Sequence, residues 1–203
     1  MCQDTCMVGG MIMNRNKQIY SMVLTSLLIA VGIVIPMISP IKVVIEPMSF
    51  TLASHGAIMI AMFISPISAL AVAIGTTMGF FLAGFPIAVV LRALSHVVWS
   101  FSGAYYIAKH PQTFESPVKS IIFNLVIAVM HAVLEMIVVV PFYMGTDASS
   151  FMYMVFGLVG VGTIVHSFVD FVISLIVWNA LSKSDSIAKI ANVKKVNLIQ
   201  KQA

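Results

Sequence analysis

Long apolar runs constrain the fold of this chain more than any other feature. Only 9% of its 203 residues are charged and its mean hydropathy is +1.05, whereas about a quarter of the residues in a soluble domain are charged. The chain is therefore expected to be an all-α integral membrane protein. About twenty apolar residues cross the hydrocarbon core, which predicts a compact bundle of six transmembrane helices. The predicted spans are 19–39, 51–65, 67–83, 86–108, 119–141 and 152–181. Pro66 is expected to separate the second span from the third, and Gly84-Phe85-Pro86 the third from the fourth.

The two ends of the chain differ from this apolar centre. Residues 1–14 hold both cysteines, Cys2 and Cys6, and are expected to form a disordered extension. Two thiols without nearby histidines lack the four ligands of a zinc site, so no metal is predicted there. Residues 15–185 form the predicted membrane domain, and 186–203 a basic cytoplasmic tail.

Basic residues predict how the bundle is oriented. Lysine and arginine in short loops stay on the cytoplasmic side, which places both termini inside and leaves Lys42 outside. The net charge of +4 then reflects orientation, and no nucleic-acid partner is expected. The residues predicted to lie inside are Arg15, Lys17, Lys109, Lys119, Lys183, Lys189, Lys194, Lys195 and Lys201.

Small residues form two flat faces. In the third run they recur every fourth position, at Ala71, Gly75, Gly79 and Ala83, and in the first run Ser26 and Ala30 repeat the pattern. Such faces let helix backbones approach closely in lipid. Packing within one bundle and docking of a partner subunit both remain open.

Polar residues inside the apolar runs are the candidate site. An ionisable group at membrane depth costs about 2.5 kcal/mol or more, so it faces the bundle interior and marks function by default. Three pairs of these residues are four positions apart, which places both members of a pair on one helical face. The pairs are Arg92/His96, His131/Glu135 and His166/Asp170. The candidate residues are His55, Arg92, His96, Trp99, Asn124, His131, Glu135, His166 and Asp170.

Two interpretations of these residues stay open. They pair with one another to satisfy buried charge, Arg92 with Glu135 or Asp170, or they converge on a cavity for a small polar solute. Arg92 with neighbouring histidines suits a carboxylate, because a guanidinium donates two parallel hydrogen bonds. The spacing of His131 and Glu135 is also that of metal ligands on a helix, but hydrogen bonding explains it equally well, so no metal or cofactor is predicted.

Missing motifs narrow the function further. The sequence has no GxxxxGK[ST] phosphate loop and no GxSxG nucleophile elbow. The chain is therefore not expected to be an enzyme or to hydrolyse ATP by that route. A binding unit of this kind takes its energy from another protein.

The chain resembles the substrate-binding S components of energy-coupling factor (ECF) vitamin transporters. The resemblance covers residues 15 to about 185 and includes SLLIAVGIVIP (26–36), where Ser26 and Ala30 match the family's coupling motif, although Ser26 replaces the usual alanine. FTLASHGAIMIAMFISP (50–66) and FPIAVVLRALSHVVWS (85–100) are most similar to the niacin-type group.

This resemblance implies a vitamin pocket near the outer surface, between the fourth, fifth and sixth helices and capped by the first external loop. It also implies partners, a transmembrane coupling subunit and two ATPases, in a bacterial plasma membrane, and a reorientation of the whole subunit to release the vitamin. Arg92 would then bind the carboxylate of nicotinate. The coupling residues would be Ser26, Ala30, Gly75 and Gly79.

Other functions are compatible with the same residues. The vitamin could be pantothenate or another heterocycle. A proton-coupled secondary carrier would use His131, Glu135, His166 and Asp170 as a relay. A purely structural subunit would bind no small molecule.

Overall fold

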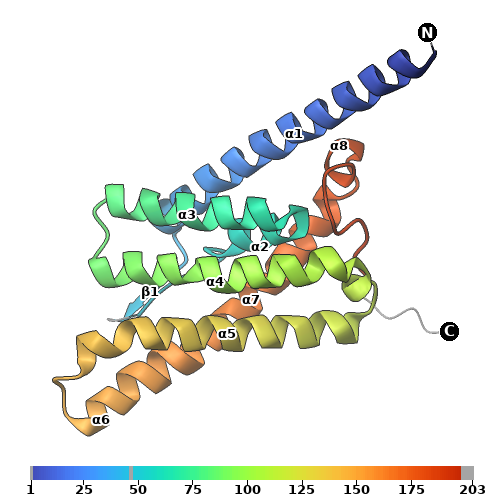
Figure 1. Cartoon of the computed structure of the whole chain (residues 1–203). Coiled ribbons are helices and arrows are strands. Elements are labelled where there is room, and N and C mark those ends of the chain that lie inside the picture. Colours follow the sequence, from blue (N-terminus) through green and yellow to red (C-terminus); the bar gives the residue numbers. More distant parts are fainter. Residues whose placement is uncertain (1, 46–47, 198–203) are drawn as a thin grey trace.

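A computed structural model describes the backbone of residues 2–45 and 48–197, and the side chains of 15–41 and 50–197. The described chain is helical apart from one hairpin (Figure 1). The hairpin pairs β1 (Lys42–Ile45) with β2 (Met48–Thr51) in antiparallel fashion. The helices are α1 (Cys2–Ile38), α2 (Gly56–Ile64), α3 (Pro66–Leu82), α4 (Ile87–Lys109), η1 (Pro111–Glu115), α5 (Pro117–Tyr143), α6 (Ala148–Phe151), η2 (Met152–Val161), α7 (Gly162–Leu181) and α8 (Asp185–Ala188).

Four described helical stretches are long and apolar enough to cross a membrane: Arg15–Ile38, Ile87–Lys109, Pro117–Tyr143 and Ala148–Leu181. They coincide with the first, fourth, fifth and sixth predicted spans. The chain is thus a helical membrane protein. Helix α1 begins at Cys2, so it continues through most of the stretch expected to be an extension.

The second predicted span, 51–65, was wrong at its start. Thr51 ends strand β2 and residues 52–55 form a turn, so helix α2 has only nine residues. A helix of that length covers about 14 Å, less than half of the hydrocarbon core. Every residue of α2 is buried, which explains why its apolar sequence looks like a lipid-facing span. The hairpin itself was missed in an otherwise helical prediction.

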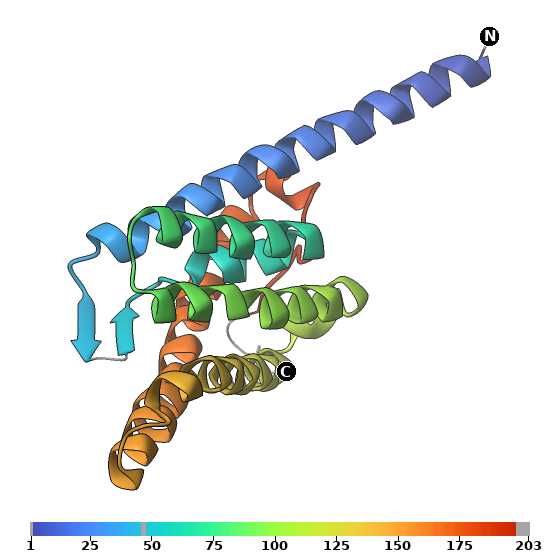
Figure 2. The ribbon, with the colours of Figure 1, turned by 60° about the vertical axis from the view of Figure 1, so that its left-hand side comes forward.

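Short breaks separate α2, α3 and α4, as the prolines and glycines predicted. Ser65 is extended (φ −165°, ψ 159°) and its hydroxyl accepts a hydrogen bond from the amide of Ser68, while Pro66 occupies the first turn of α3. This is an ordinary helix N-cap. Gly84, with φ +76°, makes the turn before α4. Helices α3, α4 and α5 lie side by side, and α7 crosses behind them (Figures 1 and 2).

The small-residue face of α3 packs against α1. A methyl group added at Gly75 would lie 2.8 Å from Cγ2 of Ile29, and one at Gly79 would overlap Ile33. The two glycines therefore allow close approach within the chain. This arrangement is the internal-packing alternative, and a partner role for these two residues remains a prediction. Ser26 and Ala30 lie on the exposed side of α1.

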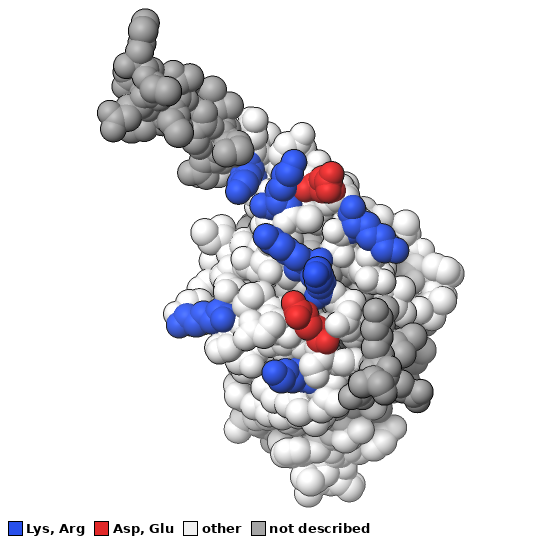
Figure 3. Space-filling model, turned by 90° about the vertical axis from the view of Figure 1, so that its right-hand side faces the viewer, with Lys and Arg blue, Asp and Glu red and all other residues white. Residues whose placement is uncertain are grey.

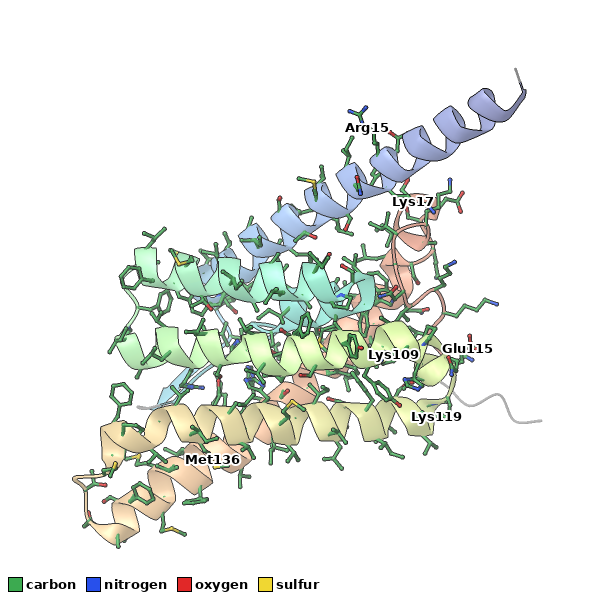
Figure 4. All side chains as sticks on the ribbon, viewed as in Figure 1. Arg15, Lys17, Lys109, Glu115, Lys119 and Met136 are labelled. Atoms are coloured by element: carbon green, nitrogen blue, oxygen red, sulfur yellow. The ribbon has the colours of Figure 1, made fainter. Side chains whose placement is uncertain are left out.

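One end of the bundle is basic and closed by aromatic residues. Arg15, Lys17, Lys109 and Lys119 lie at this end, and Figure 3 shows lysine and arginine gathered there (Figures 3 and 4). The rings of Phe63, Phe114, Phe171 and Trp178 pack together beneath it, all with 0% exposure.

The C-terminal segment docks onto this aromatic cluster. The indole nitrogen of Trp178 donates to the carbonyl of Val193 (3.1 Å), and the amide of Asn192 donates to the carbonyl of Phe63 (3.0 Å). Val193 is fully buried. The described part of the predicted basic tail is thus attached to the end of the bundle.

Candidate functional site

The candidate polar residues converge at the opposite half of the bundle. Arg92 and His96 come from α4, His131 and Glu135 from α5, and Asp170 from α7, while His55 immediately precedes α2. All six side chains are buried, and His131 and Asp170 have 0% exposure. The spacing of four residues within each pair turns both members toward this site.

Glu135 is the centre of one network. Its Oε2 accepts a hydrogen bond from Nη2 of Arg92 (2.9 Å) and one from the hydroxyl of Thr163 (2.7 Å). Its Oε1 lies 3.3 Å from Nε2 of both His96 and His131. A buried carboxylate needs such partners, because an isolated buried charge is very costly. The mutual pairing considered from the sequence is therefore present for Arg92 and Glu135.

Asp170 is the centre of a second network, which fixes the turn before α2. Its Oδ1 accepts from the amide of Ala53 (2.7 Å), and its Oδ2 accepts from the amide of His55 (3.0 Å). The same Oδ2 lies 3.1 Å from Nδ1 of His55. Ala53 has φ +62°, a strained value for alanine. The carboxylate of α7 thus holds a turn that would otherwise be unfavourable.

Four imidazoles meet between the two networks. The ring of His55 lies 4.8 Å from that of His96, 4.7 Å from that of His131 and 4.9 Å from that of His166. The indole of Trp99 packs against His131 at 4.9 Å and forms a wall behind the cluster. Nε2 of His166 also contacts the hydroxyl of Ser54 (3.1 Å). The arrangement offers many donors and acceptors in a small volume.

Asn124 does not lie with this cluster. Its amide donates to the backbone carbonyl of Phe168 (3.3 Å) and joins α5 to α7. Sequence reasoning also missed Thr163 and Ser54, which contact Glu135 and His166. Hydroxyl residues are common in membrane helices, so Thr163 carries no signal of its own. Ser54 could have been found through its neighbour His55.

A small cavity opens among these residues. Its volume is about 60 Å³, whereas a cavity of about 150 Å³ is known to hold a benzene ring. The end of β2 and the turn that follows it supply one wall through Thr51 and Ser54. Phe50 extends that wall by packing on the ring of His166 at 5.1 Å. The loop would have to move for a ring-sized molecule to enter. Other lining residues are Gly32, Pro36, His55, Ile58, Thr76, Phe80, Phe85, Val89, Arg92, Ala93, His96, Glu135, Thr163 and His166.

The glycine at position 160 lets η2 approach α5 beside this cavity. A methyl group there would lie 2.9 Å from the sulfur of Met136, which is labelled in Figure 4. A larger groove of about 360 Å³ lies between α4 and α5, but Tyr106, Ile122 and Val126 in its lining are exposed on the outer surface of the bundle. The enclosed polar cavity is the better candidate for a specific site.

A membrane bundle with a small cavity lined by several buried ionisable side chains is typical of proteins that bind small solutes within the bilayer. The chain is 36% identical over 197 residues to the niacin transporter NiaX of Lactococcus lactis subsp. cremoris (strain MG1363), and this covers 92% of the chain and 88% of the relative. The chain belongs to the family of this transporter. No family model matches the chain, and no solved structure matches it.

Proposed function

We propose that this chain is the substrate-binding S component of an ECF transporter and that it binds niacin for import. The observation that carries the proposal is the identity along nearly the whole chain to a protein named as a niacin transporter. The buried polar cavity supports it, because a small polar heterocycle needs several convergent hydrogen-bonding groups.

Nicotinate suits this cavity chemically. It has a carboxylate and a ring nitrogen on a flat aromatic ring. Arg92 lines the cavity and can recognise the carboxylate by charge-assisted hydrogen bonds, and the imidazoles of His55 and His96 lie beside it. Trp99 and Phe50 frame the cluster with apolar surface. The vitamin would enter where the loop before α2 moves away.

The path of the chain supports six crossings with both termini inside. Helix α1 starts at the basic end of the bundle. The segment from β2 through α2 returns to that end, because the amide of Asn192, in the C-terminal segment that docks there, donates to the carbonyl of Ile64 (3.3 Å). Extended backbone at membrane depth is tolerated where it is buried in protein, as around Thr51. The positive-inside rule then makes the basic end cytoplasmic and turns the cavity outward in a cell membrane.

Niacin binding should be measurable on the purified protein alone. We expect calorimetric titration in detergent to give about one nicotinate per chain, with pantothenate as the matched negative ligand. Binding of pantothenate with higher affinity would reassign the vitamin. Absence of binding by either compound would favour a structural subunit.

Uptake should require partner proteins, because the sequence has no phosphate loop for ATP. Cells expressing this chain alone should take up radiolabelled niacin at background rates, and co-expression of an ECF coupling subunit with its two ATPases should restore uptake. Equal uptake in both strains would contradict the proposal. That outcome would favour a proton-coupled carrier.

Replacement of Ala30 by tryptophan should abolish uptake and leave nicotinate affinity nearly unchanged. Ala30 and Ser26 lie on the exposed side of α1, where a flat face permits close helix approach and a bulky ring prevents it. Val31 is also exposed (38%) but lies about 100° around the helix, so Val31→Trp is the matched control and should transport normally. Loss of binding together with uptake in Ala30→Trp would assign the face to internal packing.

A further inference from the structure

We propose that His55, His96 and His131 hold a divalent transition-metal ion of the zinc type at the wall of this cavity, which His55 and His96 line. The ion keeps one position open, and the ring nitrogen of niacin occupies it. This second step rests on the proposed function, whereas the metal site stands on the geometry of the three imidazoles alone.

The three rings form a nearly equilateral triangle. Their centroids are 4.7 Å apart for His55 and His131 and 4.8 Å apart for the other two pairs. The ring planes are close to perpendicular, at 73° to 86°. One nitrogen from each ring and one oxygen of Glu135 all lie within 4.8 Å of one another. Tetrahedral zinc at 2.0–2.1 Å from nitrogen needs ligands about 3.3 Å apart, so a small inward turn of the rings completes the site.

The surroundings of His55 match those of a metal ligand. Its Nδ1 lies 3.1 Å from Oδ2 of Asp170, a carboxylate that also holds the backbone amide of the same residue. A histidine that binds metal usually donates its second N–H to a carboxylate or carbonyl, which fixes the tautomer and the ring. Asp170 therefore presents Nε2 of His55 to the cluster.

His131 supplies an independent observation. It has 0% exposure, and neither of its ring nitrogens makes a hydrogen bond to the described residues. Nε2 lies 3.3 Å from Oε1 of Glu135, but the orientation does not form a hydrogen bond. A buried imidazole in this state is unfavourable. A metal ion provides the partner that its lone pair lacks.

The charge of the cavity favours the same conclusion. Among the described residues around it, Arg92 carries one positive charge, and Glu135 and Asp170 carry one negative charge each, so neutral imidazoles leave a net charge of −1. Such a site would repel nicotinate. A divalent ion changes the net charge to +1, which the nicotinate anion neutralises. Protonation of two imidazoles would give the same total but would place like charges side by side in a buried site.

The size of the cavity agrees with an ion. A cavity of about 60 Å³ beside the three imidazoles has room for water. A water molecule bound to the ion would fit this space without any movement of the loop. Niacin would replace the water when the loop opens, and the metal would hold its ring nitrogen.

The test uses the purified full-length protein after removal of metal by a chelator. Zn²⁺ should rebind at about one ion per chain, and Co²⁺ in the same site should show the visible absorption of a four-coordinate ion with nitrogen ligands. Nicotinate should shift that absorption, and benzoate, which lacks the ring nitrogen, should not. The chelated protein should bind nicotinate at least tenfold more weakly until Zn²⁺ is restored.

Two variants locate the site. His131→Ala should weaken Co²⁺ binding at least tenfold, whereas His110→Ala should bind normally, because His110 is exposed and lies outside the cluster. If a variant fails to fold, the wild-type protein still tests the site through its nicotinate affinity before and after removal of the metal.

Unchanged nicotinate affinity after removal of metal, with Co²⁺ binding equal in the wild type and in His131→Ala, would overturn the metal site and leave niacin binding intact. One bound metal without any niacin binding would support the metal site and refute the proposed vitamin. A Co²⁺ spectrum that shifts equally with benzoate and nicotinate would overturn the assignment of the ring nitrogen.

Discussion

Replacement of Arg92 by alanine is expected to destabilise the folded protein by about 3–5 kcal/mol, the usual cost of leaving one partner of a buried ion pair behind. Glu135, at 2% exposure, would lose the guanidinium that now donates to it at 2.9 Å. Thermal unfolding in detergent measures the loss. Arg92→Ala/Glu135→Gln should recover much of it, because the stranded charge is then gone.

Lys109→Ala is the matched control for this experiment. Lys109 is an exposed cation on the same helix, placed 4.3 Å from the ring of Tyr105, and its loss should change stability by about 0.5 kcal/mol or less. A stability of Arg92→Ala equal to that of this control would show that the Arg92–Glu135 pair does not stabilise the fold.

The double variant also separates the two roles of Arg92. If Arg92 contacts the vitamin, the folded double variant should bind nicotinate roughly tenfold to a hundredfold more weakly, since charged hydrogen bonds contribute about 1.5–3 kcal/mol. Nicotinamide, which is neutral, should lose less. If Arg92→Ala lost affinity equally for nicotinate and nicotinamide, and the double variant regained it for both, Arg92 would be removed from the vitamin site.

Replacement of Asp170 by alanine is the second change with a large expected effect. The carboxylate accepts from two backbone amides and contacts the ring of His55. Each stranded buried donor costs about 1–3 kcal/mol, so we expect a loss of about 3 kcal/mol or more. The turn at Ala53 would lose the contact that holds its positive φ. Nicotinate affinity should fall at least tenfold, because the turn forms one wall of the cavity.

Hydrogen exchange followed by mass spectrometry tests this explanation directly. In Asp170→Ala the amides of residues 53–55 should exchange much faster than in the wild type, and Asp170→Asn, which keeps one acceptor oxygen, should be intermediate. Ser174→Ala is the matched control one turn along α7, because its hydroxyl donates to the carbonyl of Asp170 (2.7 Å) and to the sulfur of Met59 (3.7 Å) but does not contact residues 53–55. Unchanged exchange at residues 53–55 would refute a role of Asp170 in holding the turn.

The sequence predicted which residues form the site better than it predicted how they pair. A spacing of four residues within a helix places His131 and Glu135 on one face, and the cost of burial points that face inward. The partner across the bundle depends on helix rotation and crossing, which local spacing does not encode. Arg92 therefore had two candidate carboxylates, Glu135 and Asp170, and only the three-dimensional arrangement shows that it contacts the first.

The sequence did not predict the hairpin and the short helix α2, for a different reason. Burial inside protein and burial in lipid demand the same apolar side chains, so the run 51–65 looks like a spanning helix. Its first residue instead ends strand β2, residues 52–55 form a turn, and the helix begins only at Gly56. Prolines and glycines gave a more reliable signal, since Pro66 and Gly84 stand where the chain breaks.

The aromatic cluster at the basic end has a consequence for the energetics of the cell. Phe63, Phe114, Phe171 and Trp178 have no exposed surface, and the C-terminal segment lies over them. None of these four residues lines the cavity, so they form a packed layer between it and the basic end. We expect a bundle packed in this way not to discharge the proton and sodium gradients, however many copies lie in the bilayer.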